Sequence, residues 1–158
     1  MTKPASFSLT LERLWQFSLQ YYSVRGVKEA CLAVQNKHHG NVNLLLLLKW
    51  LDEQHLAFQE NDWHKVQQCI LRSENLLQQY REIRKKAKSY LPGSLYRESL
   101  EFELLLEKQQ QSDLVDCINS LNIADNQSES LIQNYCRQLN AEHLYEHFSS
   151  CSLHPSEP

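Results

Sequence analysis

Residues 41–51, NVNLLLLLKWL, form the most apolar segment of the chain and decide its fold. The five consecutive leucines, Leu44 to Leu48, point in every direction around a helix axis, because successive residues of an α-helix are about 100° apart. A helix that is apolar on all sides is stable only when other elements cover it completely. The segment therefore predicts the central helix of a small helical domain, with Asn41 or Asn43 as its N-cap.

The flanking sequence predicts further helices around this one. Apolar residues recur every three or four positions over about 10–22, 27–37 and 95–110, and in one long stretch over 63–90. A short helix from Ser112 and a last one, capped by Ser128 and ending near Phe148, complete the pattern. Three glycines and four prolines in 158 residues, with no alternation of period two, give no signal for strands.

The predicted fold is all-α, a single-domain bundle of six or seven helices over 1–148 with a polar, disordered tail over 149–158. Gly40 is expected to end the second helix in a left-handed conformation. The third helix becomes one-sided after Trp50, so Asp52 is expected to face water. Helical spacing places a stripe of apolar side chains of each later helix in the core, and these stripes include Ile83, Phe102 and Leu105.

Charge and composition exclude several classes of protein. A net charge of -3 gives no strong attraction to nucleic acid or anionic membranes. The leucine run is shorter than the roughly 20 apolar residues that span a bilayer, and no apolar signal-peptide core follows the N-terminus. The five cysteines are odd in number and widely spaced, which indicates free thiols. We therefore expect a cytoplasmic protein without a membrane segment.

Three segments of the first fifty residues follow one another at a distinctive spacing: Trp15-x-Phe17-Ser18, Gly26-Val27-x-x-Ala30-Cys31-Leu32 and Asn41-Val42-Asn43-Leu44-Leu45-Leu46. In this order they resemble an uncharacterised family of short bacterial proteins of similar length with a variable C-terminus. The family pattern usually has Leu-Gln-Asp where this chain has Val34-Gln35-Asn36. The resemblance covers about a third of the chain. It implies a cytoplasmic bacterial protein of unknown function and brings no catalytic residue with it.

Two groups of side chains are candidates for binding. Five cations, Arg81, Arg84, Lys85, Lys86 and Lys88, occupy eight positions near the end of the long helix. They suggest a phosphate-binding patch for RNA, although cations on a solvated face also complement the negative C-terminal end of a helix.

Aromatic side chains form the second group. The first helix carries Trp15, Phe17, Tyr21 and Tyr22, which cover more than one stripe of its surface. Some of them are therefore expected at the surface, where exposed aromatic rings mark protein interfaces. Trp15 and Tyr22 are the residues that we predict to contact a partner.

The segment His143-Leu144-Tyr145-Glu146-His147 matches H-x-x-E-H, in which two histidines one helical turn apart bind zinc. Such a site needs a third protein ligand, and only Glu157 follows; Cys136 or Cys151 would be alternative ligands for a structural metal. The alternative is a half-buried structural His143.

No other catalytic signature is present. The chain has no pair of Glu-x-x-His motifs, no glycine-rich phosphate loop and no nucleophile elbow. We therefore predict no catalytic residue, no cofactor and no metal, apart from the pair His143 and His147.

The leading functional hypothesis is a non-enzymatic cytoplasmic adaptor or regulatory protein that binds another protein. RNA binding through residues 81–88 is the alternative. A metal-binding protein or an enzyme that uses His143 and His147 is the second alternative.

Overall fold

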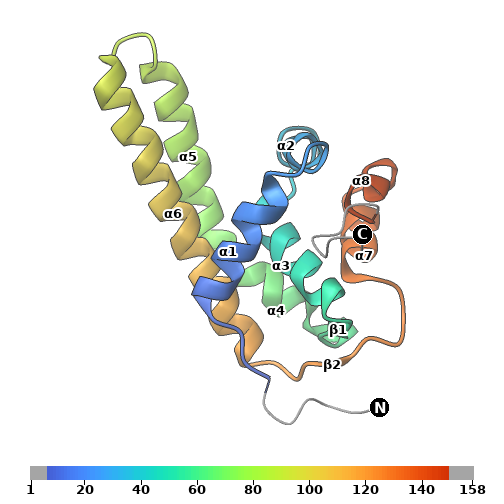
Figure 1. Ribbon diagram of the computed structural model, residues 1–158. Helices are drawn as coiled ribbons and strands as arrows, with labels where there is room; N and C mark the ends of the chain where they lie inside the picture. The colour runs from blue at the N-terminus through green and yellow to red at the C-terminus, as the bar shows by residue number, and fades with distance from the viewer. Residues whose placement is uncertain (1–6, 150–158) are drawn as a thin grey trace, which may run out of the picture.

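Helices packed around α3 (Val42–Glu53) make up the described part of the chain, which in this computed structural model comprises residues 7–149 (Figure 1). The all-α prediction is confirmed. Residues 1–6 and all but the first residue of the predicted tail 149–158 lie outside the described residues. The remaining elements, in chain order, are α1 (Leu11–Tyr22), α2 (Val27–Lys37), β1 (Leu56–Ala57), the 3-10 turn η1 (Glu60–Asp62), α4 (Trp63–Gln68), α5 (Leu71–Ala87), α6 (Gly93–Asn119), β2 (Ala124–Asp125), α7 (Leu131–Gln138), the 3-10 turn η2 (Glu142–Leu144) and α8 (Tyr145–Ser149).

The leucine run forms the buried centre of this arrangement, as predicted. The side chain of Asn41 accepts a 2.7 Å hydrogen bond from Leu44 N and caps α3. The leucines from Leu44 to Leu48 are at most 4% exposed, and α3 packs against α1, α2, α6 and α7. Because every residue from Asn43 to Leu51 is buried, the helix is covered along nearly its whole length.

The prediction that α3 turns one side to water after Trp50 is wrong for Asp52, although Gln54, the residue that follows α3, is exposed. Lys49 is buried, and its Nζ lies 3.0 Å from Glu53 Oε2 and donates to the carbonyl of Phe148. Asp52 is also largely buried, and it accepts hydrogen bonds from two backbone N–H groups at the start of α7. Helix α7 begins two residues later than predicted, with Ser130 as its N-cap, and covers the end of α3 that the sequence alone leaves open.

The predicted long helix over 63–90 is broken at Cys69 and Ile70, which separate α4 from α5. Ile70 has φ -108° and ψ -1°, and its side chain is buried in the core. Conversely, the two helices predicted over 95–110 and from Ser112 are one continuous helix, α6. Helices α5 and α6 form an antiparallel hairpin whose far end stands clear of the other helices (Figure 1).

This projection explains a second error of the sequence analysis. Ile83, Phe102 and Leu105 are predicted in the core, but they are 64%, 50% and 62% exposed. Their spacing does mark an apolar face, yet in the described structure no element covers it.

Gly40 has a different role from the predicted one. The residue with a left-handed backbone is His39, with φ 60°. At Gly40 a Cβ atom would lie 2.4 Å from Val34 Cγ1 and 2.7 Å from Leu139 Cδ1. Only a residue without a side chain permits this approach of α2 to the segment after α7.

Two strands were not predicted at all. β1 and β2 pair antiparallel over two residues each, which is too short for alternation to show in the sequence. Four cysteines, Cys31, Cys69, Cys117 and Cys136, are free thiols, and Cys151 lies outside the described residues. Among residues 7–149, no helix has both the length and the apolar character needed to cross a bilayer.

Candidate functional site

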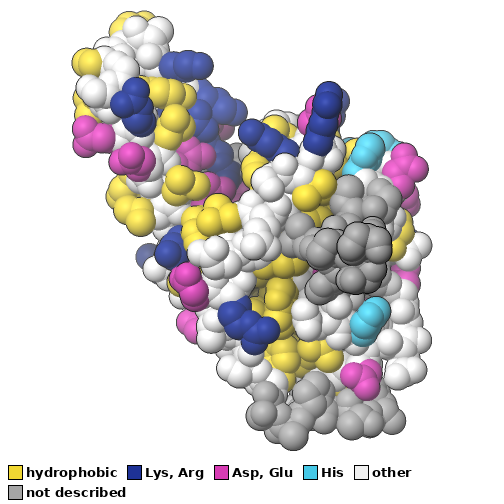
Figure 2. Space-filling view, in the orientation of Figure 1, with side chains coloured by type: hydrophobic (Ala, Val, Ile, Leu, Met, Phe, Trp, Pro, Cys, Tyr) yellow, Lys and Arg dark blue, Asp and Glu magenta, His cyan; other side chains and the backbone are white. Residues whose placement is uncertain are grey.

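A recess of about 350 Å³ lies where the α5–α6 hairpin meets α1, α2 and α3. One wall is apolar and partly aromatic and comes mainly from α1, α2 and α3, whereas the charged wall comes from α5 and α6. The apolar wall comprises Trp15, Leu19, Tyr22, Leu32, Val42, Leu46 and Leu104; the charged wall comprises Arg81, Arg84, Lys85, Glu103 and Glu107. Figure 2 shows Lys and Arg side chains gathered on the hairpin and on the part of the body that faces it.

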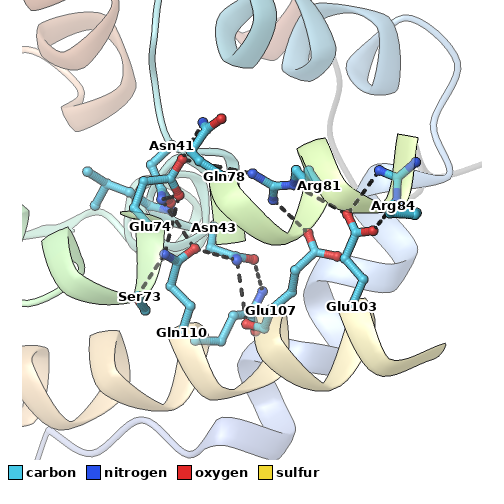
Figure 3. A network of polar contacts seen from close by, with 12 residues as sticks. Asn41, Asn43, Ser73, Glu74, Gln78, Arg81, Arg84, Glu103, Glu107 and Gln110 are labelled. Atoms are coloured by element: carbon cyan, nitrogen blue, oxygen red, sulfur yellow. Dashed lines mark hydrogen bonds and ion pairs between the residues drawn. The ribbon is translucent and has the colours of Figure 1, made fainter. Parts of the chain in front are cut away.

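Apart from Lys85, the charged wall consists of ion pairs between α5 and α6 (Figure 3). Arg84 Nε lies 2.6 Å from Glu103 Oε1, and Arg81 Nε lies 3.3 Å from Glu103 Oε2. Arg81 is only 8% exposed and also lies 3.6 Å from Glu107 and 3.9 Å from Glu74. Burial raises the pKa of Glu107, and Arg81 partly offsets this rise. The arginines therefore supply the opposite charge that the buried carboxylates of Glu103 and Glu107 need.

Lys85 differs from the two arginines beside it. It lines the recess but forms no ion pair within the described residues. Lys108 Nζ lies 5.5 Å from the ring centroid of Trp15, and Lys28 Nζ lies 6.0 Å from that of Tyr22. Cations therefore outnumber carboxylates around the recess.

A network of buried amides lies behind the recess (Figure 3). Asn43 Nδ2 donates to Gln110 Oε1 at 2.8 Å, and Asn41 Nδ2 donates to the same oxygen at 3.2 Å. Gln110 Nε2 in turn donates to Ser73 Oγ. Each of these amides links helices that are distant in the sequence, so the network fixes the hairpin on α3.

Gln111, which is fully buried, extends this network to α1. Its Nε2 donates to Ser18 Oγ at 2.9 Å and to Asn43 Oδ1 at 3.1 Å. Two buried atoms of the network have no hydrogen-bond partner among the described residues, Gln111 Oε1 and Arg81 Nη1. Unpaired buried polar atoms cost stability, and such departures from good packing concentrate at functional sites.

Comparison with known proteins bears directly on this region. The sequence model of a family of proteins of unknown function, DUF2390, matches residues 13–114. The chain belongs to this family. The match confirms the resemblance found in the first fifty residues and extends it to α6, so that it includes every residue of the recess and of its amide network. No curated protein and no solved structure matches the chain.

Within the DUF2390 region, the recess unites the two groups that the sequence suggested separately. Trp15 and Tyr22, predicted to contact a partner, line the same recess as Arg81, Arg84 and Lys85. The other two predicted cations are placed elsewhere: Lys86 is exposed and does not line the recess, and Lys88 Nζ lies 5.8 Å from the ring centroid of Tyr96. The basic segment is therefore divided among an ion-pair cluster, the recess and the outer surface. Nucleic-acid binding by it stays a prediction.

Sequence reasoning missed the carboxylates and amides that complete the site. Glu103, Glu107 and Gln111 follow one another at intervals of four residues and so share one face of α6. This spacing, together with two arginines three residues apart on α5, is the sequence signal for ion pairs between the two helices. It indicates ion pairs only if α5 and α6 are known to pack side by side, which the sequence alone does not show.

The histidine pair lies outside the matched segment. The ring centroids of His143 and His38 are 5.4 Å apart, and His147 is on α8, after the 3-10 turn that carries His143. Within residues 7–149, no group of three or more His, Cys, Asp or Glu side chains could hold a metal ion. The further ligands considered, Cys151 and Glu157, lie outside the described residues.

A second, wider hollow of about 950 Å³ lies between β1 and the loop before α7. Its charged side chains are Glu60, Asp125 and Glu129, and no cation lines it. One of these carboxylates, Glu129, already forms a 2.6 Å ion pair with Arg137. The hollow does not combine aromatic rings with cations, and its side chains do not converge on a position where a metal ion could bind. The recess beside α5 and α6 is therefore the better candidate site.

Proposed function

We propose that this protein is a non-enzymatic binding protein that holds a small organic anion with an apolar body in the recess. A single observation carries the proposal: the same recess is lined by the cations Arg81, Arg84 and Lys85 of α5 and by the rings of Trp15 and Tyr22 of α1. Its volume of about 350 Å³ is in the lower part of the range of roughly 300–1,000 Å³ for small-ligand sites.

Charge supports an anion rather than a cation. Three cations and two carboxylates line the recess, and Lys28 and Lys108 add two positive charges beside its aromatic rings. Because Glu103 and Glu107 already pair with the arginines, the carboxylates are not free to bind a cation. Lys85 remains available to bind an anionic group at the rim.

The apolar wall indicates the chemistry of the uncharged part of the ligand. Leu32 and Leu104 are 37% and 51% exposed, and burying such surface contributes about 25 cal/mol per Å². A planar or branched hydrocarbon body would cover them and lie against Trp15. We therefore expect a carboxylate, sulfonate or phosphate ester on a hydrophobic body, and no chemical step.

A pair of fluorescent probes tests the proposal. 8-Anilinonaphthalene-1-sulfonate has an apolar body with one negative charge, and N-phenyl-1-naphthylamine has the same rings without the charge. We expect the sulfonate to bind more tightly, with an advantage that falls at about 1 M salt, where the Debye length is about 3 Å. Lys85→Gln should raise the Kd of the sulfonate about three- to fivefold and leave the neutral probe unchanged.

Lys86→Gln is the matched control, because Lys86 is the next residue and lies outside the recess. Equal affinity for the two probes, or a sulfonate affinity that is insensitive to both Lys85→Gln and Trp15→Leu, would contradict the proposal.

Protein binding is the second candidate function. What favours it is the apolar face of the α5–α6 hairpin, where Ile83, Phe102 and Leu105 are at least half exposed. Soluble proteins rarely leave contiguous apolar surface of several hundred Å² without a partner. We further propose a bacterial, cytoplasmic location, which is in keeping with the four free thiols of the described residues.

A further inference from the structure

The side of the α5–α6 hairpin that faces away from the recess carries a continuous set of apolar side chains, here called the outer face. Lys85 and Leu104 line the recess, and residues two positions away on a helix point about 200° around the axis. Ile83 and Phe102 therefore point away from the recess. The outer face comprises Leu76, Tyr80 and Ile83 of α5, Tyr90 just beyond it, and Leu95, Phe102 and Leu105 of α6.

The two helices contribute to one surface rather than two. The rings of Tyr80 and Phe102 lie 5.5 Å apart between centroids, and the Tyr80 hydroxyl donates to the Ser99 carbonyl at 2.8 Å. These contacts join the α5 and α6 residues side by side. Six of the seven members are 46–86% exposed, and Figure 2 shows hydrophobic side chains along the hairpin.

We propose that the outer face docks onto the same face of a second copy of this chain, so that two hairpins form a four-helix bundle. The spacing on α5 is that of a helix–helix seam. Leu76, Tyr80, Ile83 and Ala87 of α5 follow at intervals of four, three and four residues, which is the a/d pattern of packed helices. A second copy supplies the two antiparallel helices of matching length that complete a bundle.

The size of the face is in keeping with a dimer. Seventeen residues of α5 extend about 25 Å, and two adjacent helices are about 20 Å wide. The projected area of the outer face is thus roughly 500 Å². Its accessible surface is larger, because the side chains protrude from this plane. A stable interface buries about 800 Å² of accessible surface per partner, so the apolar face supplies more than half of that area and the polar rim has to supply the rest.

Charge complementarity at the rim also fits a second copy. Arg84 pairs with Glu103, which places Lys86 level with Glu101 along the hairpin, and Glu98 lies one turn nearer the tip. A twofold axis parallel to the hairpin sets α5 of one copy on α6 of the other. Lys86 of each copy then approaches Glu98 and Glu101 of its partner, twice in one isologous interface.

The test is the mass of the full-length protein by sedimentation equilibrium over a wide range of concentrations. We expect a monomer–dimer equilibrium, and Leu76→Glu should raise its Kd about 100-fold or more, because the dimer would bury two unpaired carboxylates. Leu71→Glu is the matched control: it lies on the same helix with 52% exposure against 55% for Leu76, but points away from the outer face. It should leave the Kd unchanged.

A charge exchange tests the orientation of the two copies. Lys86→Glu should weaken the dimer, and the double variant Lys86→Glu/Glu101→Lys should restore it. A monomer at all concentrations would overturn the proposal, as would a dimer insensitive to Leu76→Glu and Phe102→Glu. Binding of a monomer to phosphatidylglycerol vesicles, or to a different protein, through the same residues would overturn it in favour of that occupant. Because the recess faces the other way, failure here leaves the anion proposal untouched.

Discussion

The carboxylate of Asp52 accepts a 2.8 Å hydrogen bond from the backbone N–H of Leu131, so that the end of α3 caps the beginning of α7. Its second oxygen accepts from Ile132 N at 3.0 Å. These N–H groups favour the charged carboxylate, but burial outweighs them and raises the pKa of Asp52 to about 6. The contact that closes the core on this side is therefore sensitive to pH.

Asp52→Asn should remove this sensitivity. The folded pKa lies above the usual value of 3.8, so the folded state holds the proton more tightly. The resulting stabilisation is fully present below about pH 4 and is lost as the pH rises through 6. Between pH 4 and 7 the wild type should lose about 2 kcal/mol relative to Asp52→Asn, measured by urea unfolding, because the unfolded carboxyl is already partly ionised at pH 4. A stability difference that does not change with pH would contradict the raised pKa, and Glu82→Gln, at an exposed position of α5, is the control.

Helix periodicity could predict α1, α2 and the central α3, because each of these helices is defined by its own apolar residues and cap. It could not predict the break at Ile70, where tertiary packing of α4 on α6 overrides a continuous helical pattern. Nor could it distinguish a covered apolar face from an uncovered one, which is why Ile83 was misplaced. The cations and aromatic rings of the site were visible in the sequence, but their convergence depends on how the hairpin packs against α1.

The two glycines Gly40 and Gly93 should respond in opposite directions to alanine. At Gly40 the new methyl group would overlap Val34 and Leu139, so we expect a loss of about 1–3 kcal/mol. At Gly93 the new methyl group would have no atom within 4 Å, and the backbone is not left-handed, so alanine should stabilise by about 0.4–1 kcal/mol. Thermal unfolding of the two variants measures both effects. A Gly40→Ala variant as stable as Gly93→Ala would show that α2 does not pack against the segment after α7 as described.

Asn43 and Gln110 should be energetically coupled, because each satisfies the other in a buried position. Removing Gln110 leaves the amides of Asn41 and Asn43 and the hydroxyl of Ser73 without this partner. We expect Gln110→Ala to cost about 2–4 kcal/mol and the Asn43→Ala/Gln110→Ala cycle to give a coupling of about 1–3 kcal/mol. Chemical denaturation of the four proteins supplies the cycle. Strictly additive effects would mean that the two amides act independently.

Arg81 should be more important to stability at neutral than at acidic pH. Arg81→Met leaves Glu103 and Glu107 buried without this cation, and breaking a buried pair in this way costs about 3–5 kcal/mol. The pKa of Glu107 is already raised by burial and should rise further in the variant, so lowering the pH should relieve part of the cost. Urea unfolding at about pH 7 and pH 4.5 compares the two conditions. A cost that grows on acidification would contradict the ion-pair description.

Trp15 should report occupancy of the recess directly. It is only partly buried, whereas Trp50 and Trp63 are each 7% exposed, so most acrylamide quenching of the tryptophan emission should come from Trp15. Trp15→Phe should remove that component and leave the shielded emission of the two buried tryptophans. Decanoate is a suitable ligand, because it is an anion with an apolar body and does not absorb near the tryptophan emission. It should protect Trp15 from acrylamide in the wild type. This protection should weaken in Lys85→Gln but not in Lys86→Gln. If decanoate protects Trp15 equally in the wild type, Lys85→Gln and Lys86→Gln, Lys85 does not take part in binding, and the recess binds only the hydrocarbon part of the ligand.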